Sequence, residues 1–153
     1  AVLIVRYKVT ATPPTYVNAE PREKRRGTEM AIKTSSDARV RRERLADVPL
    51  VDQVRALKEL LGPKLMSLTM GVDSTTVERW INESTVPNLD NEKRIRTAYQ
   101  IFSLLKPVEA SPTIRAWFMG MNPQLEDQSP AEAIAEGNLR ETLAAARAFL
   151  AGG

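Results

Sequence analysis

The sequence predicts an all-α protein, and two observations carry this prediction. From residue 50 onward, apolar residues recur at the three- and four-residue spacing of amphipathic helices, and no strand pattern follows residue 10. Proline and glycine divide this pattern into about six or seven short helices. With 42% hydrophobic residues the chain can bury a core, and its 5% aromatic content makes that core mostly aliphatic.

The first two expected helices meet at a glycine–proline pair. One helix face carries Leu50, Val54, Leu57 and Leu61. Gly62 is expected to end this helix and Pro63 to begin the next, because glycine suits helix ends and proline suits first turns. The second helix should end at Met70, where Gly71 permits a tight turn.

Capping residues mark the next two helices. Asp73 or Ser74 is expected to cap a helix over Thr75–Asn82, since short polar side chains accept hydrogen bonds from first-turn amides. Asp90 is expected to cap a longer helix that Pro107 ends.

Three further helices are expected near the C-terminus. Ser111 and Ser129 each precede a proline, the order of a cap followed by the first helical residue. Glu132 completes a capping box with Ser129. An amphipathic helix over Asn138–Leu150 closes the chain.

Charge divides the chain into three parts that we take as its domains. Residues 1–48 carry 11 Lys or Arg against six acids, residues 49–106 eight against seven, and residues 107–153 three against six. The first part is interpreted as a flexible basic arm, although Ser35–Asp47 has a weak helical pattern. The other two parts are expected to be a helix-turn-helix domain and a small helical module.

Residues 1–29 suggest a hypothesis about the start of translation. Glu23–Arg26 can be encoded by a purine-rich stretch that resembles a bacterial ribosome-binding site, and Met30 follows at a suitable spacing. Residues 1–29 would then be a translated leader, and the net charge of the remainder would fall to zero. The alternative is a basic arm that touches nucleic acid or stays solvated.

The composition narrows the possible chemistry. The chain has no cysteine and no histidine, which excludes disulfides, thiol nucleophiles, Cys/His zinc sites and histidine general bases. Its carboxylates are scattered and no glycine-rich phosphate loop is present, so we expect no enzyme, no metal and no cofactor. The longest early apolar run, Ala1–Val5, is too short to span a membrane, and the expected location is the cytoplasm.

The spacing around Gly71 is typical of a DNA-binding helix-turn-helix. A small residue, Ser67, precedes the glycine by four positions, and apolar Val77 and Trp80 follow it by six and nine. The predicted DNA contacts are Lys64, Ser74, Thr75, Thr76, Arg79, Lys93 and Arg94. A plain helical hairpin is the alternative, and Glu78 on the same face weakens phosphate attraction.

An ordered set of residues resembles the Xre/MbcA/ParS-type antitoxins over about residues 50–153. The set is Val77, Arg79, Trp80 and Pro87, then Trp117, Asn122-Pro123, Leu125, Pro130 and Gly137. The loop Leu125–Gln128 departs from the family pattern because it lacks a glycine.

The resemblance implies an antitoxin of a type II toxin–antitoxin system. Such a protein pairs with a RES-domain toxin that destroys NAD⁺, covers its active site, often represses its own operon at operator DNA, and forms a homodimer or a larger assembly. The implied toxin-binding residues are Trp117, Asn122, Leu125, Glu132, Glu136, Glu141 and Arg147. The acids could instead only complement helix N-termini, and Trp117 could belong to the core. A stand-alone helix-turn-helix regulator with another protein partner is the alternative function.

Overall fold

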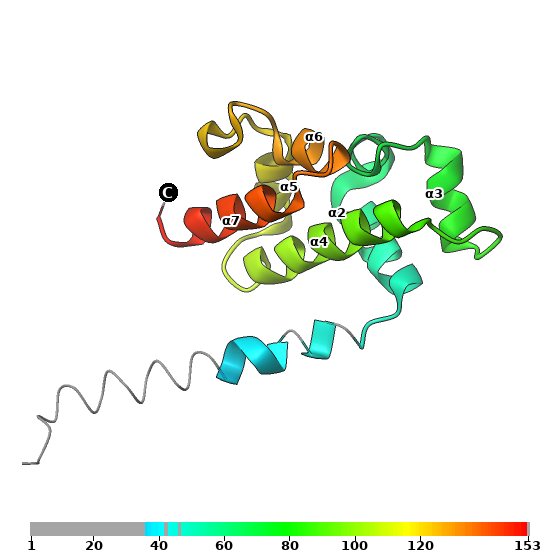
Figure 1. Cartoon of the computed structure of the whole chain (residues 1–153), viewed down its shortest axis with the longest axis horizontal. Helices are drawn as coiled ribbons and strands as arrows, with labels where there is room; N and C mark the ends of the chain where they lie inside the picture. The colour runs from blue at the N-terminus through cyan, green and yellow to red at the C-terminus, as the bar shows by residue number, and fades with distance from the viewer. Residues whose placement is uncertain (1–35, 42, 46, 153) are drawn as a thin grey trace, which may run out of the picture. The chain divides into compact units, whose positions relative to one another are not determined.

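A computed structural model of the chain describes residues 36–41, 43–45 and 47–152 (Figure 1). It divides into two units, Ala1–Arg44 and Leu45–Gly153. In the first unit, the described residues are helical, and Arg39 Nε lies 3.5 Å from Glu43 Oε2 on an exposed surface. The predicted leader and the rest of the basic arm up to residue 35 lie outside the described residues.

The second unit confirms the all-α prediction, since its described residues form helices and no strand. Its elements are α2 (Leu50–Met70), α3 (Ser74–Ile81), α4 (Leu89–Leu105), α5 (Ser111–Met119), the 3-10 turn η2 (Pro123–Leu125), α6 (Pro130–Ala135) and α7 (Leu139–Leu150).

Helix α2 lies at the centre of the second unit, in contact with α3, α4, α5 and α6. Helix α7 lies alongside α4, and α3 stands across the far end of the unit, as Figure 1 shows. The largest fully buried apolar side chains of α2 and α4 are Val54, Leu57, Leu61, Met66, Met70, Ile95, Ile101 and Leu105. Burying each large apolar side chain contributes about 1.5–3 kcal/mol, so this aliphatic core stabilises the packing of α2 against α4.

Helix α2 contains the break that the glycine–proline pair predicts. Gly62 has φ 81° and ψ 166°, outside the helical region, and Pro63 follows it inside the element. A Cβ at Gly62 would lie 3.3 Å from Arg115 Nη2 on α5. The non-helical backbone at Gly62 and the following Pro63 kink α2, and the second half of the helix leads from this kink to the turn at Gly71.

The structure confirms two of the predicted caps. Asp73 caps α3 by accepting from the Thr76 amide, and Ser129 caps α6 by accepting from the Glu132 amide. Aspartate and serine are among the preferred N-cap residues, which is why the sequence predicts these two caps.

Two other predicted caps were wrong. Asn88, not Asp90, caps α4, because the Asn88 backbone is extended and its side chain accepts from the Asn91 amide at 2.9 Å. Ala110, not Ser111, is the N-cap of α5, and no side chain caps that helix. Asp90 lies in the first turn of α4, where a negative charge still complements the helix dipole.

Candidate functional site

The turn between α2 and α3 is built around a glycine with left-handed backbone. Gly71 adopts φ 69° and ψ 30°, the left-handed conformation that glycine reaches without a Cβ penalty. The Gly71 amide donates to the Leu68 carbonyl and the Val72 amide to the Ser67 carbonyl, both at 3.1 Å. These two hydrogen bonds form a helix C-cap that satisfies carbonyls in the last turn of α2, and the chain turns here toward α3.

Apolar residues on one face of α3 fix it against the rest of the unit. Val77 and Trp80 are 2% and 5% exposed, and α3 packs against α2. The predicted inward positions of this helix are therefore confirmed. The opposite face, with Ser74, Thr75 and Arg79, is exposed.

The N-terminus of α3 is ordered by Asp73. Its Oδ1 accepts from the Thr76 amide at 2.7 Å. Hydrogen bonds from the Thr76 hydroxyl and then from the Thr76 amide, aided by the Arg79 charge, lower the pKa of Asp73 below its ordinary value of 3.8. Thr76 is half-buried and engaged with this cap, so it is less accessible than its neighbours Ser74 and Thr75.

The predicted phosphate contacts differ in their surroundings. Lys64 and Lys93 are exposed. Arg94 is half-buried, and it donates from Nε to the Ile134 carbonyl at 3.3 Å and from Nη1 to Asn91 Oδ1 at 2.9 Å. Arg94 therefore joins α4 to the end of α6, which leaves its guanidinium less available for DNA.

Basic side chains of α2 reach α3, a contact that the sequence analysis missed. Lys58 Nζ donates to Glu78 Oε2 and forms an ion pair with it. Arg55 Nη2 donates to the Ile81 carbonyl at 3.1 Å. These residues are 20 and 26 positions apart, so no local pattern indicates the pairing.

Trp117 and Leu125 belong to the core of the C-terminal part. Trp117 is 9% exposed, and its ring centroid lies 5.3 Å from that of Phe118 and 6.3 Å from that of Phe149. Leu125 is 6% exposed. These placements favour the structural role that the sequence left open for Trp117, and they give Leu125 a similar one.

The loop after Leu125 adopts left-handed backbone without glycine. Glu126 has φ 55° and Asp127 has φ 64°. Asn122 begins this loop, where its side chain accepts from the Gln124 amide at 2.9 Å and its carbonyl accepts from the Asp127 amide at 3.0 Å. The loop is thus a tight, hydrogen-bonded turn, and Asn122 has a structural task at its start.

Acidic side chains surround a hollow of about 470 Å³ beside this loop. We call it the acidic hollow, and it is lined by Gln124, Leu125, Glu126, Gln128, Glu136, Asn138 and Glu141. Gln128 Nε2 donates to Glu136 Oε1 at 3.0 Å and links the loop to the end of α6. The hollow brings together the predicted residues Leu125, Glu136 and Glu141. It adds Glu126, which the sequence analysis did not select.

The remaining predicted partner contacts lie outside the hollow. Glu132 and Arg147 are exposed but do not line it. Glu132 stands in the first turn of α6, where its charge complements the helix dipole.

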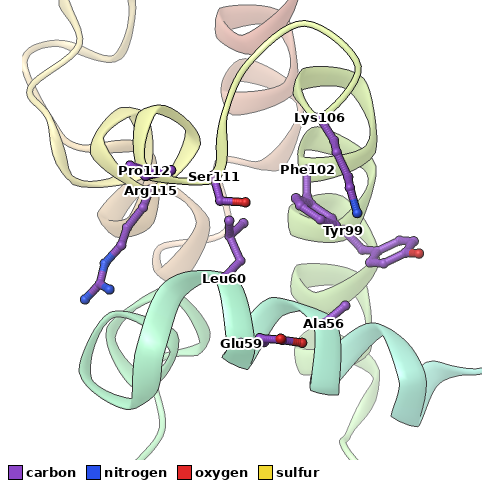
Figure 2. A pocket seen from close by; sticks show the side chains of 9 residues that line it. All are labelled: Ala56, Glu59, Leu60, Tyr99, Phe102, Lys106, Ser111, Pro112 and Arg115. Atoms are coloured by element: carbon purple, nitrogen blue, oxygen red, sulfur yellow. The ribbon is translucent and has the colours of Figure 1, made fainter.

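A second hollow, of about 610 Å³, opens between α2, α4 and α5 (Figure 2). Tyr99 and Phe102 supply its apolar wall, and Lys106 Nζ lies 5.2 Å from the Phe102 ring centroid. Glu59 and Arg115 add opposite charges on the α2 and α5 sides. No local pattern indicates this hollow, because three separate helices form it.

Within residues 36–41, 43–45 and 47–152, no helix has the length and apolarity needed to cross a membrane. The same residues contain no group of three or more Asp or Glu side chains arranged to hold a metal ion. Comparisons with protein-family models, with curated proteins and with solved structures return no match.

Proposed function

We propose that this protein is a DNA-binding antitoxin. It neutralises a RES-domain toxin that degrades NAD⁺, and it represses its own operon as a homodimer or as part of a larger complex with the toxin. The observation that carries the DNA-binding half is the α2–α3 turn, in which a left-handed Gly71 precedes a helix with a buried inner face and an exposed polar outer face. This half of the proposal does not depend on any resemblance.

The outer face of α3 offers the side chains that duplex DNA requires. Ser74 and Thr75 lie in the first turn of α3 and are exposed, which suits hydrogen bonds to phosphates or base edges. Arg79 is exposed one turn later and has the bidentate geometry that guanine accepts. Lys64 and Lys93 supply exposed cations for phosphates.

The toxin-binding half rests on the family resemblance and on the charge of the acidic hollow. Glu126, Glu136 and Glu141 line one open hollow in the part of the chain that carries the antitoxin-like residues. A site that binds the phosphates of NAD⁺ is expected to be cationic, and complementary charge guides such partners together. The hollow therefore supports contact with a basic rim at the toxin's active site.

Co-expression with a RES-domain toxin, where a gene beside that of this protein encodes one, tests the proposal. We expect the full chain to restore growth and intracellular NAD⁺, and to co-purify with the toxin. Failure to restore growth would reject the antitoxin function. Operator binding without any such partner would indicate the stand-alone regulator instead.

Two groups of variants separate the two halves. Thr75→Ala with Arg79→Ala should weaken operator binding while neutralisation persists, because both side chains are exposed on α3. Glu136→Gln with Glu141→Gln should weaken toxin binding while operator binding persists. Deletion of Asn138–Gly153 is a less clean test, because α7 contributes the buried residues Ala145 and Ala146 and its loss destabilises the core. Circular dichroism of each variant checks that the helices remain.

A further inference from the structure

The side chain of Glu78 lies on the same exposed surface as the proposed DNA contacts. We call this surface the recognition face and define it by Ser74, Thr75, Glu78 and Arg79. Glu78 lies four residues after Ser74, about one helical turn. A carboxylate at this position would ordinarily repel the phosphates of DNA.

The Lys58 side chain compensates the charge of Glu78. Lys58 comes from α2 and pairs with Glu78 Oε2, and the two side chains are 33% and 50% exposed. Neighbouring Arg55 holds the C-terminal end of α3 through the Ile81 carbonyl. The carboxylate is therefore held on α3 as a neutral pair rather than as a free negative charge.

One carboxylate oxygen of Glu78 remains able to accept a hydrogen bond. Among the described residues, the side-chain hydrogen bond of Glu78 involves Oε2, and its Oε1 has no such partner. In the major groove, a glutamate typically accepts a hydrogen bond from the amino group of cytosine. A charge-compensated glutamate can make this contact without the electrostatic cost of an isolated one.

We propose that Glu78, positioned by Lys58, is a specificity-determining residue that selects a cytosine in the operator. This inference rests on the proposed DNA-binding function and deepens it. An ordinary surface ion pair between Lys58 and Glu78 would contribute to stability only weakly and would have no effect on base preference.

Selection of binding sites from random-sequence duplex DNA, using the full chain, provides the test. The enriched sequence is then varied one base pair at a time, and affinities are measured for the unaltered chain and for Glu78→Ala. We expect the unaltered chain to lose about fivefold in affinity when the selected C·G pair becomes T·A, the lower end of what one base contact contributes. Glu78→Ala should bind both sequences equally at that position and keep its preferences elsewhere.

Lys58→Met tests the compensating role separately. With the Glu78 charge uncompensated, binding should weaken for every sequence, including non-specific DNA, while the cytosine preference persists. Adding Glu78→Ala to Lys58→Met should recover the general affinity but not the preference. Glu59→Ala is the matched control. It removes an exposed acid next to Lys58, and Glu59 lines the second hollow, so this variant should leave both the general DNA affinity and the cytosine preference unchanged.

Three outcomes of these DNA-binding measurements would contradict the inference. If Glu78→Ala keeps the unaltered preference at every position, Glu78 does not select a base and the inference is wrong. If Lys58→Met binds non-specific DNA as well as the unaltered chain does, Lys58 does not compensate the charge, which also overturns it. If the unaltered chain enriches no sequence, the proposed DNA-binding function itself fails, and the inference fails with it.

Discussion

Arg94 Nε donates a hydrogen bond to the carbonyl of Ile134 at 3.3 Å. Arg94 is in α4, which follows α3, and Ile134 is in α6, which belongs to the C-terminal part. The guanidinium also donates to Asn91 Oδ1, and Asn91 is only 7% exposed. The contact therefore joins the two proposed functional parts through a partly buried charged donor.

Arg94→Met should destabilise the fold, since it removes these two hydrogen bonds and leaves the Asn91 amide oxygen without its donor. We expect the free energy of unfolding to fall by about 1.5–3 kcal/mol, the range for hydrogen bonds to charged groups. Lys93→Met is the matched control, because Lys93 is the exposed neighbour. It should change stability by less than about 0.5 kcal/mol while lowering DNA affinity. Urea unfolding and DNA titration measure the two effects, and equal destabilisation by both variants would contradict the structural role of Arg94.

Local sequence patterns predict the helices well, but not the contacts between distant helices. The spacing around Gly71 and the apolar positions Val77 and Trp80 are local features, and the structure bears them out. Choosing between Asn88 and Asp90 as a cap depends on where the backbone turns from extended to helical. Two nearby cap-forming residues leave that choice open.

The contacts that local sequence patterns do not reveal are those whose partners lie far along the chain. The sequence predicts Arg94 as a DNA contact and gives no sign of the hydrogen bond to the Ile134 carbonyl of α6, which lies 40 residues later. Glu126 lines the acidic hollow only because the loop after Leu125 turns back toward α6 and α7. Such contacts depend on packing, and neither periodicity nor capping patterns encode them.

Gly71→Ala should destabilise the turn between α2 and α3. A Cβ at this position has room, since its nearest contact is the Ala135 carbonyl oxygen at 4.0 Å, so the cost comes from the positive φ of 69°. We expect a loss of about 1 kcal/mol in the free energy of unfolding. Gly71→Asn should cost less, because asparagine adopts left-handed backbone more readily. Thermal unfolding of the two variants gives the comparison, and an asparagine variant less stable than the alanine variant would contradict a conformational cause.

The Asp73 cap should make stability depend on pH in the acidic range. The pKa of Asp73 is lowered in the folded state, so its ionised form is favoured there. Its stabilising contribution is present above the unfolded pKa near 3.8 and is lost as the pH falls through the lower folded value. Asp73→Asn keeps a capping oxygen and should remove this dependence, whereas Asp73→Ala should lower the unfolding temperature at neutral pH too. Unfolding midpoints measured between neutral and strongly acidic pH test both variants, and an unchanged pH profile in Asp73→Asn would exclude the cap as its source.

Glu126 and Asp127, which both have left-handed backbone, allow effects on stability to be distinguished from effects on toxin binding. Both have positive φ, and a non-glycine residue in this conformation is strained by about 1–2 kcal/mol. Glycine removes that strain but gives the unfolded chain more freedom, which offsets about 0.4–1 kcal/mol of the gain. Glu126→Gly and Asp127→Gly should each raise the free energy of unfolding by up to about 1 kcal/mol, with the smaller gain at Asp127 because aspartate tolerates this conformation better.

The two glycine variants should differ in toxin binding. Glu126 lines the acidic hollow and Asp127 does not, so only Glu126→Gly removes a carboxylate from it. We expect Glu126→Gly to bind the toxin more weakly despite its greater stability, and Asp127→Gly to bind it as the unaltered chain does. Calorimetric titration with a catalytically inactive toxin measures both affinities. Equal affinities for the two variants would show that the hollow's charge does not contribute, and would direct the search for the toxin contact to Glu132 and Arg147, which lie outside the hollow.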